Sequence, residues 1–502
     1  MPVTYAANSD NARPVLNIAQ TSRVLNRSQA TNGLFMFDEM RHNAELRAGW
    51  QSVADWLNAT DLESLRQKKA EAEALFRRIG ITFAVYGEGG DPERLIPFDL
   101  IPRVFSAGEW ARIEAGVKQR ARALNLFIHD VYNAGEIFKA GIVPREAVNA
   151  NDAYQALMKD FSPPRNVYTH VVGIDLIRTG PDELFVLEDN CRTPSGISYV
   201  LENREIMTRL FPELFAGGNI RPVDTYGDLL RKALNETAPE NCPQTPNIVV
   251  LTPGHFNSAY YEHSFLADEM GVTLVQGSDL FVENNVVYMR TTLGPERVDV
   301  IYRRIDDAFL DPKAFRPDSM LGVPGLMDAY KAGTVTIANA PGAGVADDKA
   351  IYCYMPEIIR HYLGEEPLLP NVETYRCAIP DEYAYAMANM KHLVFKEVHG
   401  SGGYGMLIGP QASTSEIEAY AHRVRKNPAG FIAQPTLALS TCPSLVEEGI
   451  APRHVDLRPF ALVGADVRLI PGGLTRVAMR EGSLVVNSSQ GGGVKDTWVM
   501  RK

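Results

Sequence analysis

Apolar residues recur mainly at helical spacing through the first part of the chain. Between residues 37 and 79 they fall on one stripe, which a polar interruption divides; Thr60 or Asp61 is placed to cap a second helix. Ser106 and Glu109 have the spacing of a capping box and predict a third helix that continues to about residue 128. The pattern therefore predicts a largely helical N-terminal region.

After residue 163 the pattern changes to short apolar runs separated by turn-rich connections. Residues 168–177 and 184–187 predict two strands around a turn. A strand, a glycine-rich loop, a second strand, a helix and a third strand are expected between residues 393 and 434. Between these regions, four runs end in glycine, proline or aspartate and predict a parallel α/β sheet whose strand ends carry the working loops. The four runs begin near Asn247, Val272, Val298 and Thr334.

Composition narrows the class of protein. A chain of 502 residues, 45% hydrophobic and 22% charged, predicts about three globular domains. Its formal net charge of −11 argues against general binding to nucleic acids or anionic membranes. The five cysteines are scattered without a C-x-x-C motif, which disfavours a disulfide framework or a zinc site. The N-terminus lacks an apolar leader and no stretch of about 18 apolar residues occurs, so we expect a soluble, cytoplasmic protein.

The two strands after residue 163 carry a candidate metal site. If the turn is centred near Pro181, Asp175 lies opposite Glu188, and Asn190 follows on the same face because strand side chains alternate. Opposed carboxylates repel unless a cation lies between them, and oxygen ligands of this kind suit Mg²⁺. The alternative is that both carboxylates point into water near an arginine.

A glycine-rich loop predicts nucleotide binding. Lys396 precedes a G-x-G-x-x-G pattern at Gly400, Gly402 and Gly405, but a strand follows the loop where a Rossmann fingerprint requires a helix. Backbone N–H groups of such a loop can approach phosphate oxygens, and the lysine adds positive charge. Gln434, at the end of the third strand, is a candidate for reading an adenine edge. An ordinary glycine turn beside a surface lysine is the alternative.

The order of these motifs resembles the circularly permuted ATP-grasp type 2 family, which is related to glutathionylspermidine synthetase. The resemblance extends over about residues 80–500 and rests on LEDNCRTPSGISYVLENR, YRRIDDAFLDP, GVADDKAIYCYMPEIIRHYLGEEP, VFKEVHGSGGYGMLIGP and SSQGGGVKDTWV. It implies an α/β, circularly permuted ATP-grasp fold in four parts. These are an N-terminal arm and helical region (1–160), a segment with the magnesium hairpin (161–215), a Rossmann-like pre-ATP-grasp domain (216–345) and a nucleotide-binding region (346–502).

The resemblance also implies roles for individual residues. Asp175, Glu188 and Asn190 would hold one or two Mg²⁺ ions against ATP, with Lys349 and Lys396 as the ATP lysines. The segment that would cover the phosphates comprises Gly400, Ser401, Gly402, Gly403, Tyr404 and Gly405.

One position departs from the synthetase pattern. Arg192 replaces an Asp of that motif, while Thr193 and Pro194 remain, so the resemblance leaves the substrate open. Arg192 could bind a carboxylate or the transferred phosphoryl group. Arg304 and Arg458 are candidates for carboxylate or transition-state clamps, with ordinary salt bridges as the alternative. A second glycine loop, from Asn487 to Lys495, could cover substrate or merely close the domain.

By resemblance the protein is an ATP- and Mg²⁺-dependent carboxylate–amine ligase that works through an acyl phosphate. Its substrates would be a small-molecule or peptide carboxylate and an amine, and the sequence leaves open a protein partner or a homo-oligomer. Two other functions stay open: a nucleotide-binding regulatory or assembly protein without ligation, and a phosphotransferase.

Overall fold

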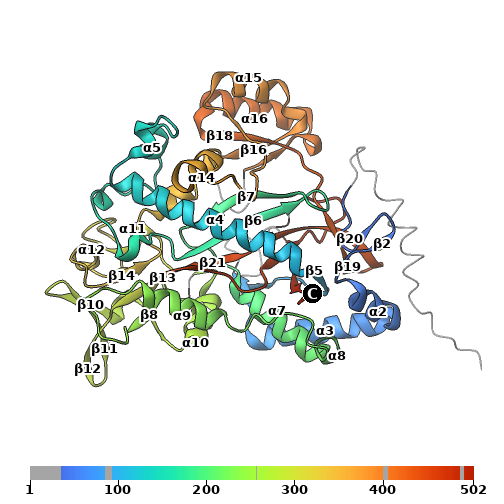
Figure 1. The fold of residues 1–502 in the computed structure, drawn as a ribbon, viewed down its shortest axis with the longest axis horizontal. Helices are drawn as coiled ribbons and strands as arrows, with labels where there is room; N and C mark the ends of the chain where they lie inside the picture. The colour runs from blue at the N-terminus through green and yellow to red at the C-terminus, as the bar shows by residue number, and fades with distance from the viewer. Residues whose placement is uncertain are drawn as a thin grey trace, which may run out of the picture.

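The structure is a computed structural model that describes residues 36–84, 93–255, 257–399, 405–484, 486 and 491–501. Figure 1 shows a large sheet with helix α4 across it, a second sheet with helices on both of its faces and a smaller lobe above.

The helices expected near the N-terminus are present. They are α2 (Gln51–Ala59), α3 (Leu62–Ile79) and α4 (Ala107–Tyr132). The Asp61 side chain accepts a hydrogen bond from the Ser64 N–H at 2.9 Å and caps α3. Ser106 and Glu109 form the predicted capping box of α4. Shorter helical elements follow: α5 (Glu136–Lys139), α6 (Arg145–Asn149), η1 (Ala156–Met158) and η2 (Pro164–Asn166).

The prediction of helix from residue 37 is wrong at its start. β1 (Arg41–His42) and β2 (Glu45–Leu46) form a small antiparallel hairpin. Asn43 and Ala44 between them adopt φ of 50° and 68°, a turn conformation that excludes a helix.

The sequence analysis also missed a strand. β5 (Phe98–Phe105) is buried along its whole length, so it lacks the alternation by which a half-buried strand is recognised. It pairs in parallel with β24 (Gly493–Val499). The N-terminal region therefore contributes a strand to the large sheet, and a second small hairpin precedes it, formed by β3 (Thr82–Ala84) and β4 (Glu93–Leu95).

The large sheet joins segments that are far apart in sequence. Its strand order is β22-β21-β6-β20-β23-β24-β5, with β7 on β6 and β19 on β20. Its remaining strands are β6 (Val171–Arg178), β7 (Leu184–Asn190), β19 (Thr441–Val446), β20 (Gly449–Arg458), β21 (Phe460–Val463), β22 (Val467–Arg468) and β23 (Leu474–Val477). Helices α7 (Ile197–Leu210), α8 (Pro212–Phe215) and α9 (Tyr226–Glu236) follow the β6–β7 hairpin in the chain.

The predicted parallel α/β sheet is confirmed. Its order is β14-β13-β8-β9, with all pairs parallel. The strands are β8 (Ile248–Leu251), β9 (Thr273–Val275), β13 (Val300–Arg303) and β14 (Thr336–Ala338), and the helices are α10 (Tyr260–Met270), α11 (Asp307–Leu310) and α12 (Leu326–Lys331). An antiparallel sheet that the sequence analysis did not foresee lies between β9 and β13 in the chain: β10 (Leu280–Glu283), β11 (Val286–Thr291) and β12 (Gly294–Arg297).

The smaller lobe contains the predicted strand, strand, helix and strand. These are β16 (Leu393–Glu397), β17 (Leu407–Ile408), α16 (Thr414–Lys426) and β18 (Phe431–Pro435), joined by β15 (Tyr375–Arg376) and α15 (Pro380–Ala388). η4 (Ala343–Ala346), α13 (Lys349–Tyr352) and α14 (Met355–Leu363) connect it to the parallel sheet.

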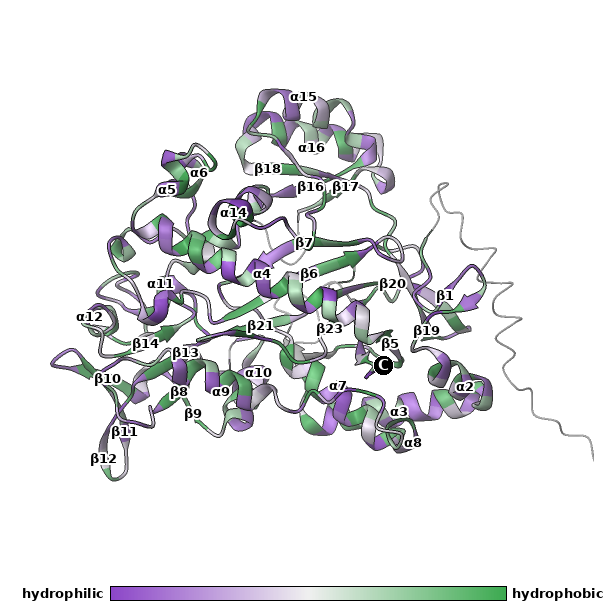
Figure 2. Ribbon diagram, viewed as in Figure 1, coloured by the Kyte–Doolittle hydropathy of each residue, from purple (hydrophilic) through white to green (hydrophobic). Residues whose placement is uncertain are grey.

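Hydropathy follows this layering. Figure 2 shows mixed colours along the outer helices α3 and α16 and green along much of the interior strand β6. None of the described helices has the length and apolar character that crossing a membrane requires. The domain boundaries at residues 160, 215 and 345 remain predictions.

Candidate active site

A cavity of about 710 Å³ lies where the large sheet, the smaller lobe and the segment before α13 meet. This is within the usual range of small-molecule sites. The cavity is lined by the β6–β7 hairpin, the segment 192–196, the segment 347–349 and residues of β16, β18, β20 and β23. Of the predicted site residues, the following line it: Asp175, Glu188, Asn190, Arg192, Lys349, Lys396, Gln434 and Arg458.

The hairpin has the geometry that the sequence predicts. Asp175 on β6 pairs with Glu188 on β7, and Asn190 pairs with Gly173. The Asn190 side-chain amide donates to the Gly173 carbonyl at 3.3 Å and lies 3.4 Å from Asp175 Oδ1. The three oxygen-bearing side chains therefore come together at one place in the cavity.

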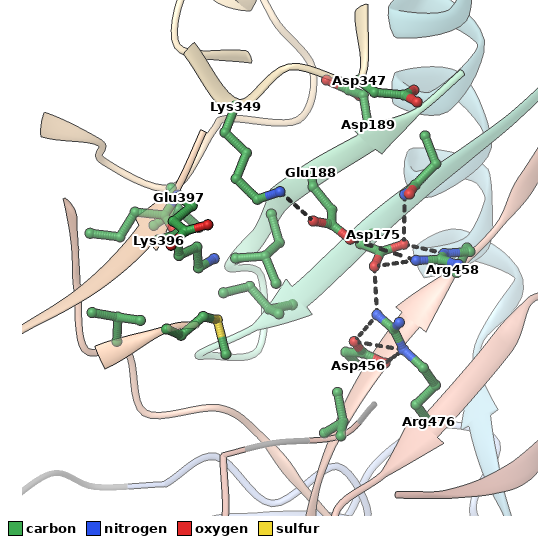
Figure 3. A pocket seen from close by; sticks show the side chains of 18 of the residues that line it. Asp175, Glu188, Asp189, Asp347, Lys349, Lys396, Glu397, Asp456, Arg458 and Arg476 are labelled. Carbon is green, nitrogen blue, oxygen red and sulfur yellow. Dashed lines mark hydrogen bonds and ion pairs between the residues drawn. The ribbon is translucent and has the colours of Figure 1, made fainter. Parts of the chain in front are cut away.

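Two arginines hold Asp175. Arg458, from the end of β20, contacts it through Nε and donates from Nη2 to Oδ2 at 2.8 Å. Arg476, from β23, donates to the same Oδ2 at 2.5 Å and also pairs with Asp456 (Figure 3). Burial alone would raise the pKa of Asp175, but the two guanidinium groups lower it below its usual range. Asp175 is therefore an anion at neutral pH.

Glu188 lies between cations of two kinds. Figure 3 shows Lys349 on one side and Arg458 on the other; Lys349 Nζ is 3.8 Å and Arg458 Nη2 is 3.6 Å from its carboxylate. These distances exceed those of a hydrogen bond, and 30% of the Glu188 side chain is exposed. The Glu188 carboxylate is therefore less tightly paired than that of Asp175.

The donor set of the hairpin fits Mg²⁺. Carboxylate and amide oxygens are its preferred protein ligands, and it normally takes only one or two carboxylates, with water and phosphate completing its shell. Within the described residues, no three His, Cys, Asp or Glu side chains are grouped closely enough to hold a metal ion by themselves. An ion at Glu188 and Asn190 would therefore depend on phosphate and water for the rest of its shell.

Lys396, on β16, is the second cation that faces the hairpin. Burial lowers its pKa to about 8, although Glu188 and Asp175 act in the opposite direction. It lines the same cavity as Lys349, which begins α13 (Figure 3). Two ammonium groups from separate elements thus converge near the carboxylates, an arrangement that suits a polyphosphate.

An apolar wall adjoins the lysines. Val372, Val394, Ile408 and Leu439 line it, and Gln434 lies at the same wall. The Gln434 side-chain amide donates to Thr374 Oγ1 at 2.9 Å, so this part of its hydrogen-bonding capacity is used within the protein.

The glycine loop is only partly described. Gly400, Ser401, Gly402, Gly403 and Tyr404 lie outside the described residues, as do Asn487 and the three residues after it. Gly405 has φ of 72°, a conformation that favours glycine, and its carbonyl accepts a hydrogen bond from the Tyr420 hydroxyl at 2.8 Å.

Arg304 does not belong to the cavity lining. Its side chain is buried, pairs with Glu262 at 3.0 Å and donates to the Pro194 carbonyl at 2.9 Å. The structure therefore places Arg304 behind the segment 192–196 and gives it no direct access to the cavity.

Asp347 and Arg476 are cavity residues that the sequence analysis missed. The Asp347 carboxylate accepts hydrogen bonds from the N–H groups of Cys191 and Arg192, and burial raises its pKa to about 6. Arg476 is a partner of Asp175 only because β23 pairs with β20. No local sequence signal gives that pairing.

Comparison with known proteins shows the family of this chain. The family model for circularly permuted ATP-grasp type 2 matches residues 102–478, three quarters of the chain. The chain belongs to this family. The resemblance found in the sequence is therefore confirmed.

Several relatives of this ATP-grasp protein are similar over most of its length. An uncharacterized Synechocystis protein is 51% identical over 89% of this chain and 93% of its own length. An uncharacterized Mycobacterium tuberculosis protein is 51% identical over 92% and 84%. A Frankia alni protein, provisionally named glutamate–cysteine ligase 2-3, is 40% identical over 93% of this chain, which spans only 54% of that relative.

A solved structure supports the fold. The apo structure of a glutathione synthetase-like effector from Globodera pallida aligns with a TM-score of 0.56 over 88% of this chain and 98% of its own. Its sequence identity is 11%, so the likeness concerns the mixed α/β fold alone.

Proposed function

We propose that this protein is an ATP- and Mg²⁺-dependent ligase that joins a carboxylate to an amine through an acyl phosphate. The observation that carries the proposal is the convergence of Lys349, Lys396 and the Asp175–Glu188 pair in one cavity. These residues come from α13, from β16 and from a hairpin that precedes both by more than 150 residues. A nucleotide site accounts for their convergence.

The proposed reaction has two steps. The substrate carboxylate oxygen attacks the γ-phosphorus of ATP, ADP leaves, and an acyl phosphate forms. The amine then attacks the acyl carbon, the C–O bond to phosphate breaks, the nitrogen loses a proton, and an amide and inorganic phosphate remain. Negative charge spreads over the phosphoryl oxygens in the first step, so catalysis depends mainly on positioned cations.

The described side chains supply those cations. Lys349 and Lys396 would bind phosphate oxygens, and Arg458 would neutralise charge beside Asp175 and Glu188. Glu188 and Asn190, with Asp175, would hold Mg²⁺, which when bound supplies further positive charge to the phosphates. Gly400 to Gly405 would cover the phosphates and Gln434 the base, as the family resemblance implies.

The names of the relatives agree with a ligase but do not fix its substrates. The Frankia alni protein is about twice as long as the matched region, so its name does not by itself belong to the part that this chain shares. The second Frankia relative with such a name is spanned to 58%.

The test measures ADP release and amide formation with purified protein, ATP, Mg²⁺, a panel of carboxylates and hydroxylamine, which traps acyl phosphates as hydroxamates. We expect Lys396→Ala and Glu188→Gln to lower the rate at least about a hundredfold, since each removes a charge that acts in the transition state. Both variants should keep their circular dichroism spectrum and melting temperature.

Three results would contradict parts of this proposal. Full activity in either variant would remove that residue from the site. A stable phosphorylated product without hydroxamate would indicate a phosphotransferase, and ATP binding without turnover across the panel would indicate a regulatory nucleotide-binding protein.

A further inference from the structure

Side chains from other segments hydrogen-bond to the backbone that follows the β6–β7 hairpin. The Asp347 carboxylate accepts from the N–H groups of Cys191 and Arg192, the second at 3.2 Å. The Asn339 side-chain amide donates to the carbonyls of the same two residues, at 2.7 and 3.2 Å. Their peptide groups are thus fixed whatever side chain residue 192 carries.

The next residues are held in the same way. Arg304 donates to the Pro194 carbonyl at 2.9 Å. Glu262 Oε2 accepts from the N–H groups of Gly196 and Ser198, at 2.7 and 3.2 Å. Because the protein itself occupies these peptide groups, they are not free to bind a ligand at this wall.

Three side chains on this wall remain available. Arg192, Thr193 and Ser195 are partly exposed and line the cavity, whereas Pro194 between them is buried. Among the described residues, neither the Thr193 nor the Ser195 hydroxyl has a hydrogen-bond partner, although a cavity-facing hydroxyl readily donates to an anion.

The Arg192 guanidinium is only loosely paired. Its Nε lies 3.6 Å from Asp347 and its Nη1 lies 3.9 Å from Asp306, both beyond hydrogen-bond length. Within the described part of the chain the Arg192 side chain donates no hydrogen bond, and 43% of it is exposed. A planar guanidinium in this state can take a carboxylate through two parallel hydrogen bonds.

We propose that Arg192, Thr193 and Ser195 form a subsite for a second carboxylate of the acyl substrate. The substrate is then a dicarboxylic acid or an amino-acid derivative that carries one carboxylate to be activated and another to be bound. This inference rests on the proposed ligase function, whose acyl donor it defines. The same anion chemistry could come from the γ-phosphoryl group of ATP, and the experiment separates the two sources.

The experiment measures binding without requiring turnover. Succinate, glutarate and L-glutamate, each beside its monoamide, are titrated calorimetrically into protein saturated with Mg²⁺ and a non-hydrolysable ATP analogue. We expect at least one diacid to bind about tenfold or more tightly than its monoamide, the size of effect that a hydrogen-bonded charge gives. Arg192→Ala should remove this preference, and Thr193→Val and Ser195→Ala should reduce it several-fold.

Arg316→Ala is the matched control. Arg316 is similarly exposed (52%), pairs with Asp318 at 2.7 Å and is not among the residues that line the cavity. It should leave the preference unchanged. Since side chains other than that of Arg192 hold its peptide groups, the Arg192→Ala variant should fold normally.

The outcomes are distinguishable. Equal binding of diacid and monoamide, or an unchanged preference in Arg192→Ala, would overturn the subsite. Loss of affinity for the ATP analogue in Arg192→Ala, with the diacid preference intact, would assign Arg192 to the phosphoryl group and also overturn it. Diacid binding that depends on Arg192, without ADP release in the wild type, would leave the subsite standing and contradict the ligase function.

Discussion

At the scale of single residues, the charged groups of the cavity differ in how firmly they are paired. Asp175 is held by two arginines, whereas Lys396 makes no ion pair within the described residues. The sequence predicted the opposition of Asp175 and Glu188 because strand alternation and one turn suffice for it. It could not predict Arg476, whose approach depends on a pairing between distant strands.

The lowered pKa of Lys396 predicts proton uptake on nucleotide binding. Burial lowers the pKa of Lys396 to about 8, so without nucleotide its ammonium group is deprotonated as the pH rises through 8. Bound phosphates favour the protonated form. Between pH 8 and 9, we expect ATP binding to take up a proton in the wild type.

The measurement is calorimetric titration in buffers of different ionisation enthalpy. In Lys396→Arg the side chain stays charged, so the uptake should disappear while binding persists. The same uptake in that variant would assign it to another group.

The two hairpin carboxylates should differ in their effect on stability. Asp175→Asn removes the carboxylate that Arg458 and Arg476 share, although Arg476 keeps Asp456 and Arg458 keeps Glu188, and should lower the free energy of unfolding by about 3 kcal/mol. Glu188→Gln removes a half-buried carboxylate with longer contacts and should cost about 1 kcal/mol or less. Urea denaturation measures both, and equal losses would contradict the contrast.

At the scale of elements, the sequence predicted what local pattern determines. The capping box of α4, the hairpin and the strands of the parallel sheet follow from periodicity and turn residues, and the structure confirms them. β5 was missed because a fully buried strand has no alternation. The β1–β2 hairpin was missed because its apolar positions also fit a helix.

Packing between elements predicts a role for Gly173. A Cβ there would lie 3.1 Å from Pro194 Cβ and 3.2 Å from Arg458 Cδ, closer than ordinary contacts. Gly173→Ala should therefore displace Arg458 or the segment around Pro194 and cost about 1–3 kcal/mol of stability.

Gly108→Ala in α4 is the control, since no atom lies within 4 Å of its added Cβ. Alanine is the better helix former, so stability should be unchanged or slightly higher. Thermal unfolding compares the two variants, and no loss in Gly173→Ala would show that the neighbours move aside without cost.

At the scale of the molecule, the cavity exists because distant parts of the chain meet. The β6–β7 hairpin lies in the large sheet, and Lys396 lies in the smaller lobe. Side chains from the region of the parallel sheet, such as Asn339, hydrogen-bond to the backbone of residues 191–198. Composition and periodicity indicated several α/β units but not how they pack together. The resemblance predicted the permuted ATP-grasp family, which the family match confirms, while the division of the chain into four parts remains a prediction.

The most direct test of the central claim is calorimetric titration of ATP into the protein with Mg²⁺ and with EDTA, beside Glu188→Gln. The account predicts binding that Mg²⁺ strengthens and a metal-dependent gain that the variant loses. Equal binding with Mg²⁺ and EDTA, or an unchanged gain in Glu188→Gln, would remove the hairpin from the metal site. No binding by the wild type would contradict the assignment of this cavity to ATP.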